Sequence, residues 1–364
     1  MAKKEDTASA ETVGDVIDRA ANSTTAVATT SADGSAIAVE KPKGESKVAV
    51  VAAILANIAV GIVKFIAAAV SGSSAMLSEG VHSVVDSGND ILILLGLRQA
   101  ARKPDSAHPF GYGMELYFWT LVVAVLIFAL GGGVSIWDGI KAIQSIVPGE
   151  TLGDPTMSYI VIAAAVIIEG TSLTVALKQF NAARGTIPPF TFIKEAKDPS
   201  LYTVVLEDSA AELGLVFAFL GIFIGHLTGN PYCDGIASIC IGLLLAAVAA
   251  ILLKETKGLL IGEGMSHDEL EEVQQIVEGN PAVLTCGRIL TMYIGPTELL
   301  VTIDAAFRPT VPAADVLQAI DRIELAIQQR FPQTTRVFIE AESLRKTQAQ
   351  RILFEAEDEN ASEI

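Results

Sequence analysis

The stretch SEGVHSVVDSGND, residues Ser78–Asp90, places a histidine, two aspartates, a glutamate and an asparagine in a chain that is otherwise strongly apolar. Of the 364 residues, 51% are hydrophobic, and the mean hydropathy is +0.48. Soluble domains rarely average so apolar, and the windows around this stretch hold almost no charge, which indicates a membrane protein. Ionisable side chains at membrane depth are costly and usually functional, so these residues are candidates for a site.

Six apolar segments are each long enough to cross a bilayer of about 30 Å as a helix. We place them at residues 48–70, 75–100, 116–137, 159–177, 201–227 and 235–253. Basic residues lie before the first segment and after the second, fourth and sixth, with little besides Lys141 in the other loops. The positive-inside rule therefore predicts both termini in the cytoplasm. We expect an integral protein of the cell (inner) membrane.

The remaining sequence divides the chain into four predicted parts. Residues 1–46 form an Ala/Ser/Thr-rich tail that we expect to be disordered, residues 47–257 hold the spans, and residues 346–364 form an acidic tail. Residues 258–345 turn soluble and predict the order helix, strand, strand, helix, strand. Ser266 and Glu269 have capping-box spacing at the first of these helices. The result is an all-α transmembrane domain followed by a small α+β domain, for which dimerisation would supply extra burial.

Several classes of function are excluded by what the sequence lacks. The three cysteines have no CxxC or paired spacing, which argues against a disulfide framework or a thiolate zinc site. No basic patch with interleaved aromatic residues appears, so nucleic acid is not an expected partner. No HExxH or GxSxG stands in a credible setting, and we do not expect an enzyme.

Two pairs of ionisable residues lie within predicted spans at the same spacing. His82 and Asp86 are four residues apart in the second span, and Asp208 and Glu212 repeat that spacing in the fifth. Each pair shares a helix face, so the two helices can present four ligands, the number that a tetrahedral divalent site needs. One imidazole with three carboxylates suits Zn, Mn, Fe(II) or Co(II). Protons compete for the same groups, which is a physical basis for metal/proton exchange; an internal ion pair with Lys64 is the alternative.

The chain resembles the cation diffusion facilitator family of metal/proton antiporters. The matching stretches are SGSSAMLSEGVHSVVD, KPDSAHPFGYGMELYFW and NPYCDGIASICIGLLL, and the likeness runs from about Lys47 to about Glu342. LEDSAAELG is most similar to the zinc-transporter branch that includes a mitochondrial member. The resemblance implies a six-span homodimer with a ferredoxin-like cytoplasmic domain, and a transport site on His82, Asp86, Asp208 and Glu212.

Two further family sites have partial counterparts here. Asp105 and His108 match a site in the loop between the second and third spans, where Tyr112 stands in place of a ligating histidine; the alternative is a structural loop. In the cytoplasmic domain, Glu340 and Glu342 stand on the last strand, at positions where family members have ligands of a second metal site. We favour a solvated face or a dimer contact for these two residues. His267 is expected to be exposed.

Other polar residues of the spans are assigned supporting roles. Asn89 lies about a turn beyond Asp86 and is a candidate partner for it, whereas Glu207 is rotated about 100° from Asp208 and is expected to contact another helix or relay protons. For Glu169 and Asp234 two alternatives stay open with equal weight, a role in packing between helices and a role in function.

These observations predict an exporter of a divalent transition metal, Zn foremost and Mn, Fe or Co as alternatives, with protons as counter-substrate. The lipid bilayer and a second copy of the chain are the expected partners. Two other interpretations stay open: a family member without transport that acts as a membrane scaffold or regulator, and a membrane-embedded metalloenzyme.

Overall fold

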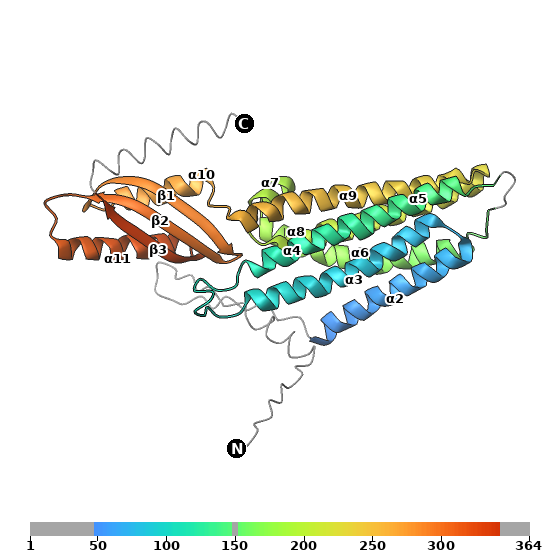
Figure 1. Cartoon of the computed structure of the whole chain (residues 1–364), viewed down its shortest axis with the longest axis horizontal. Coiled ribbons are helices and arrows are strands. Elements are labelled where there is room, and N and C mark those ends of the chain that lie inside the picture. Colours follow the sequence, from blue (N-terminus) through green and yellow to red (C-terminus); the bar gives the residue numbers. More distant parts are fainter. Residues whose placement is uncertain (1–46, 148–151, 343–364) are drawn as a thin grey trace, which may run out of the picture. The chain divides into compact units, whose positions relative to one another are not determined.

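A computed structural model of the protein describes residues 47–147 and 152–342, with side chains described for 57–147 and 152–341. The disorder predicted for residues 1–46 and the acidic tail at 346–364 lie outside the described residues. Two compact units are formed (Figure 1). The first holds the long helices, and the second holds the sheet together with the two short segments Pro104–Met114 and Glu195–Asp198.

The helices of the first unit lie lengthwise beside one another in Figure 1. They are α2 (Lys47–Ser71), α3 (Ser74–Ala100), the continuous run of α4 (Glu115–Leu126), η1 (Ile127–Gly133) and α5 (Val134–Gln144), α6 (Thr156–Arg184), α8 (Pro199–Thr228) and α9 (Tyr232–Ile261). A short helix, α7 (Pro189–Glu195), lies in the linker between α6 and α8. In it Phe190 is 76% exposed, whereas Phe192 packs edge-on against Phe180 of α6 with ring centres 5.2 Å apart.

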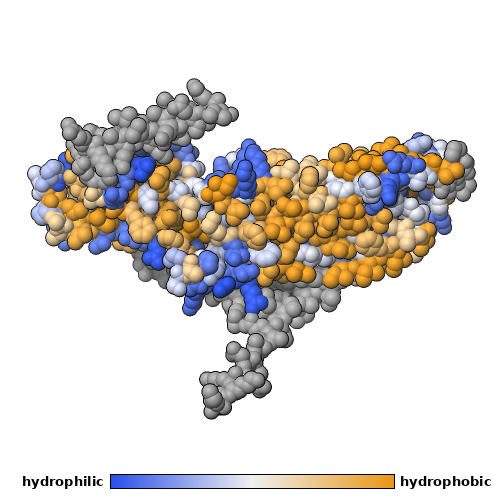
Figure 2. Space-filling view, in the orientation of Figure 1, coloured by the Kyte–Doolittle hydropathy of each residue, from blue (hydrophilic) through white to orange (hydrophobic). Residues whose placement is uncertain are grey.

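Among the described residues, four helical stretches are long and apolar enough to cross a membrane, by length and composition. They are Glu115–Gln144, Thr156–Arg184, Pro199–Thr228 and Tyr232–Ile261. In α2 the part with described side chains, Asn57–Ser71, is apolar but shorter, and α3 is long enough but carries Glu79, Asp86 and Asp90. Hydrophobic residues also cover much of the visible surface of the helical unit in Figure 2. The structure therefore describes an integral membrane protein in which four of the six predicted spans are clear within the described residues.

Glycine residues allow α9 to approach the continuous helical run of α4, η1 and α5 closely. A Cβ atom built on Gly242 of α9 would lie 2.7 Å from the carbonyl oxygen of Gly132 and 2.6 Å from Cγ1 of Ile136. One on Gly139 of α5 would lie 2.6 Å from the carbonyl oxygen of Gly235. Backbone-to-backbone contact of this kind is a common way to join helices in lipid, where hydrophobic burial between helices gives little drive.

Replacing Gly242 by alanine is expected to destabilise the protein by about 1–3 kcal/mol, because α9 must move away from η1 and α5. The thermal midpoint of the purified protein in detergent measures this loss. Gly88→Ala in α3 is the matched control, since a Cβ there meets nothing within 4 Å. That control is expected to leave the midpoint unchanged or to raise it, and an equal loss in both variants would refute the close-packing explanation.

The second unit has the predicted order of elements. Helix α10 (His267–Glu278) is followed by β1 (Val283–Gly295), β2 (Glu298–Phe307), α11 (Ala313–Arg330) and β3 (Thr334–Glu342). The capping box of Ser266 and Glu269 is present at the start of α10. The alternation of apolar residues in the sequence predicts the first strand from Arg288. Strand β1 begins five residues earlier, at Val283, because Val283 and Cys286 also pair with β2, in a stretch where the register is irregular and the alternation is lost.

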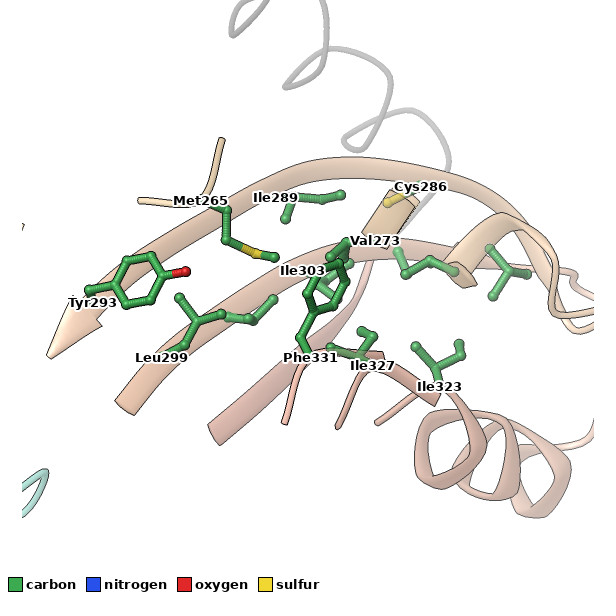
Figure 3. Packing of buried hydrophobic residues seen from close by; sticks show 14 residues of the cluster. Met265, Val273, Cys286, Ile289, Tyr293, Leu299, Ile303, Ile323, Ile327 and Phe331 are labelled. Carbon is green, nitrogen blue, oxygen red and sulfur yellow. The ribbon is translucent and has the colours of Figure 1, made fainter. Parts of the chain in front are cut away.

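The sheet has the order β1-β2-β3, with β2 in the middle. β1 and β2 are antiparallel, with Ile289 opposite Ile303, while β2 and β3 are parallel, with Ile303 opposite Ile339. A parallel pair needs a crossover, and α11 provides it. Figure 3 shows side chains of the sheet and of α11, among them Ile303 and Ile327, gathered in one apolar core.

Candidate functional site

Helix α3 packs against α2, α4 and α8, and its polar residues face these neighbours inside the unit. His82 is 3% exposed, and its Nε2 atom is buried with no hydrogen-bond partner among the described residues. Asp86 follows one turn later on the same helix. An ionisable face can exist here because neighbouring helices cover it from lipid.

Asp86 of α3 and Asp208 of α8 meet at one small cavity. The cavity has a volume of about 10 Å³, roughly enough for one water molecule or one bare ion. The hydroxyl of Ser172 on α6 donates a hydrogen bond of 2.9 Å to Oδ2 of Asp208. The full lining is Asn57, Ser83, Asp86, Glu169, Ser172, Asp208 and Ala211.

The other two predicted ligands do not line this cavity. Glu212 lies one turn beyond Asp208, and its Oε1 atom is 3.0 Å from where a Cβ of Gly170 would stand, so it points toward α6. That atom is buried without a hydrogen-bond partner, like Nε2 of His82. Throughout residues 47–147 and 152–342, no three His, Cys, Asp or Glu side chains are grouped closely enough to hold one ion. The structure thus brings Asp86 and Asp208 together, and the four-ligand arrangement stays a prediction.

Lys64 of α2 binds two other carboxylates. Its Nζ atom donates to Oε2 of Glu79 at 2.9 Å and to Oε1 of Glu169 at 2.7 Å. The side chains of Lys64 and Glu79 are fully buried, and that of Glu169 is 14% exposed. The internal ion pair considered from the sequence therefore exists, but its hydrogen-bonded partners are not among the four predicted ligands. The lone basic residue of the first span was the signal for it, and Glu79 was not singled out.

Asn89 and Glu207 form a second polar bridge between α3 and α8. The amide of Asn89 donates to Oε1 of Glu207 at 2.8 Å, and both side chains are buried. Asn89 therefore holds Glu207 rather than Asp86, and the expectation that Glu207 contacts another helix is confirmed. Asp90, which accepts a hydrogen bond from Asn57, lies close enough to Asp86 and Asp208 for their charges to interact. Its spacing of four residues from Asp86 was the signal in the sequence.

Comparison with known proteins places this arrangement in a family. A model of the cation efflux transmembrane domain matches residues 50–261, which is more than half of the chain and includes all the helices that line the cavity. The chain belongs to the cation efflux family. This is a family of transporters rather than of enzymes, so the metalloenzyme interpretation is set aside, and the resemblance seen in the sequence is confirmed.

Relatives within the cation efflux family carry more specific names. The chain is 32% identical over 290 residues to the mitochondrial proton-coupled zinc antiporter SLC30A9 of Xenopus laevis, covering 79% of this chain and 51% of that protein. It is 32% identical to the human SLC30A9 over 243 residues, 66% of this chain and 42% of that protein. Metal tolerance protein C4 of Arabidopsis thaliana is 32% identical over 283 residues, which cover 77% of this chain and 61% of that protein. The chain spans about half the length of these curated relatives.

The loop site predicted in this cation efflux protein is organised as a turn around Asp105. Oδ1 of Asp105 accepts from the backbone amides of Ala107 at 2.9 Å and His108 at 2.8 Å, and Oδ2 accepts from the hydroxyl of Tyr112 at 2.7 Å. The rings of His108 and Tyr112 are 4.2 Å apart. These bonds use both carboxylate oxygens within the loop, which supports the structural alternative more than a metal site.

The hydrogen bond from Tyr112, followed by that from the amide of His108, lowers the pKa of Asp105 to about 2. The ionised carboxylate therefore stabilises the loop above the ordinary pKa near 4, and this contribution is lost as the pH falls through about 2. Tyr112→Phe is expected to raise the pKa of Asp105 toward 4, measured by NMR titration of the labelled carboxyl carbon. An unchanged pKa would show that the tyrosine bond does not hold the carboxylate, and Phe110→Leu on the exposed side of the loop is the control.

The remaining candidates take structural positions. Asp234, at the start of α9, accepts hydrogen bonds from Oγ of Ser73 at 2.6 Å and from the backbone amide and hydroxyl of Ser74, so it caps the N-terminus of α3. His267 is exposed, as expected, and lies 3.3 Å from Glu271. Glu340 is exposed on β3, and the side chain of Glu342 is outside the described residues.

Proposed function

We propose that the protein exports a divalent transition metal from the cytoplasm in exchange for protons, with zinc the foremost cargo and Mn, Fe or Co the alternatives. The observation that carries this proposal is the shared cavity of Asp86 and Asp208, on two different helices of a cation efflux domain. The names of the relatives, proton-coupled zinc antiporter among them, support zinc and protons as the exchanged ions.

Electrostatics give the reason why a cation belongs at this cavity. A charged side chain at the membrane centre costs about 2.5–3.5 kcal/mol on insertion scales, and two carboxylates facing one cavity add mutual repulsion. A divalent cation neutralises both at once, and protons neutralise them one at a time. Metal and protons therefore compete for Asp86 and Asp208, and this competition couples their movements.

His82 and Glu212 complete the proposed ligand set. Each has a buried polar atom without a hydrogen-bond partner in the described part of the chain, Nε2 of His82 and Oε1 of Glu212. Each lies four residues from a cavity aspartate on the same helix. Small rotations of α3 or α8 during transport would present them to the cargo.

The proposal includes the arrangement in the membrane. We propose six spans, with α2 and α3 added to the four clear ones, both termini in the cytoplasm, and insertion in the cell (inner) membrane. The basic residues between the spans support this orientation. We also propose that the sheet unit is a ferredoxin-like cytoplasmic domain through which two copies form a homodimer.

Metal flux in proteoliposomes tests the proposed function. Purified protein is reconstituted, a pH gradient is imposed, and uptake of Zn, Mn, Fe(II) and Co(II) is compared by metal-sensitive dyes. We expect uptake that requires the gradient and is fastest for zinc. Uptake of none of the four metals by folded protein would contradict the proposal and would favour a membrane scaffold or regulator.

A further inference from the structure

Glu169 of α6 stands between the buried lysine and the cavity of the candidate site. Its Oε1 atom accepts the 2.7 Å hydrogen bond from Lys64, while the residue also lines the cavity with Asp86 and Asp208. Its other oxygen, Oε2, is buried and has no hydrogen-bond partner among the described residues. A buried carboxylate oxygen without a partner is costly unless something else binds it.

Ser172, three residues later on α6, faces the same cavity and donates to Asp208. Residues three apart lie on one face of a helix, so α6 presents a carboxylate and a hydroxyl together to the two aspartates. The cavity thus has walls from three helices that bear carboxylates, α3, α6 and α8, whereas the sequence indicated ligands from only two.

Asp86, Asp208 and Glu169 line one cavity, although as they stand they are not grouped closely enough to hold one ion. The geometry points to Glu169 as the third carboxylate of this cavity, which closes on the cation together with Asp86 and Asp208 when the cargo enters, and to Lys64 as its positioning residue. This inference rests on the proposed function. Lys64 binds one oxygen of Glu169 and leaves the other for the cargo, while Glu79 accepts a separate hydrogen bond from the same lysine. A third carboxylate raises the affinity for a doubly charged cation and favours harder metals, which accept oxygen ligands.

Glu79 provides a matched control, because it binds the same lysine but does not line the cavity. Binding of Zn and Mn to purified wild type, Glu169→Gln and Glu79→Gln is measured by equilibrium competition with a fluorescent chelator, without any transport. We expect Glu169→Gln to weaken binding at least about tenfold, with a larger loss for Mn than for Zn. Glu79→Gln is expected to bind within about twofold of wild type, and Glu169→Asp to recover part of the affinity.

The positioning role of Lys64 is tested by the charge-balanced pair Lys64→Met/Glu79→Gln. This double variant removes the hydrogen bond from Lys64 to Glu169 without changing the net charge. We expect a loss of metal affinity of about tenfold. Equal affinity in wild type and Glu169→Gln, or equal losses in Glu169→Gln and Glu79→Gln, would overturn the inference while the proposed function stands. Absence of metal binding by folded wild type would overturn both.

Discussion

Asp208→Asn is expected to abolish gradient-driven metal uptake while leaving the protein folded. Loss of residues that only support ligands costs about 10–100-fold in metal affinity, so loss of a direct ligand is expected to reduce uptake about 100-fold or more. The amide keeps the shape of the side chain, and its oxygen still accepts the hydrogen bond from Ser172. Because a costly intramembrane charge disappears, the thermal midpoint is expected to stay the same or rise.

The matched control for this prediction is Asp138→Asn in α5. Asp138 also lies in an apolar helix but does not line the cavity. Uptake is measured in proteoliposomes at equal protein density, and the control is expected to retain wild-type rates. Similar rates in Asp208→Asn and wild type would exclude Asp208 from the cation path.

Lys64→Met is expected to produce the largest loss of stability. It leaves Glu79 and Glu169 without their cation in the interior, and breaking a buried ion pair in this way costs about 3–5 kcal/mol. For a protein of this size we expect a fall in the thermal midpoint on the order of 10 °C. Intrinsic tryptophan fluorescence of the protein in detergent follows the transition.

The triple variant Lys64→Met/Glu79→Gln/Glu169→Gln tests the reason for that loss. It removes all three charges, and neutral replacement of buried ion pairs is often tolerated. We expect most of the lost stability to return, although metal binding does not. A triple variant as unstable as Lys64→Met would show that the lysine acts through packing of its long side chain rather than through charge.

The sequence predicted the residues on one helix better than the contacts between helices. The spacing of His82 and Asp86 already defines a shared face, because it depends only on helix geometry. The capping box of Ser266 and Glu269 is equally local and is present. Membrane helices are apolar on most sides, so periodicity does not reveal which side faces which neighbour. An ion pair of Lys64 was considered from the sequence, but its partners, Glu79 and Glu169, depend on which helix faces which and were not predicted.

The same physical limit explains the other differences. Asn89 was matched to Asp86 by its position along α3, but its hydrogen-bond partner, Glu207, is on α8. The start of β1 was placed too late because a register irregularity near Cys286 interrupts the alternation on which strand prediction depends. In both cases the deciding interaction joins residues far apart in the chain.

The most direct test of the central claim records metal and protons together in the same proteoliposomes. A zinc gradient is imposed without a pH gradient, and two internal dyes report zinc and pH at once. We predict that zinc entry by the wild-type protein drives protons out, so that the interior becomes alkaline, and that Asp208→Asn shows neither change. Zinc entry with no movement of protons would contradict the account, because the carboxylates of Asp86 and Asp208 would then not exchange one ion for the other.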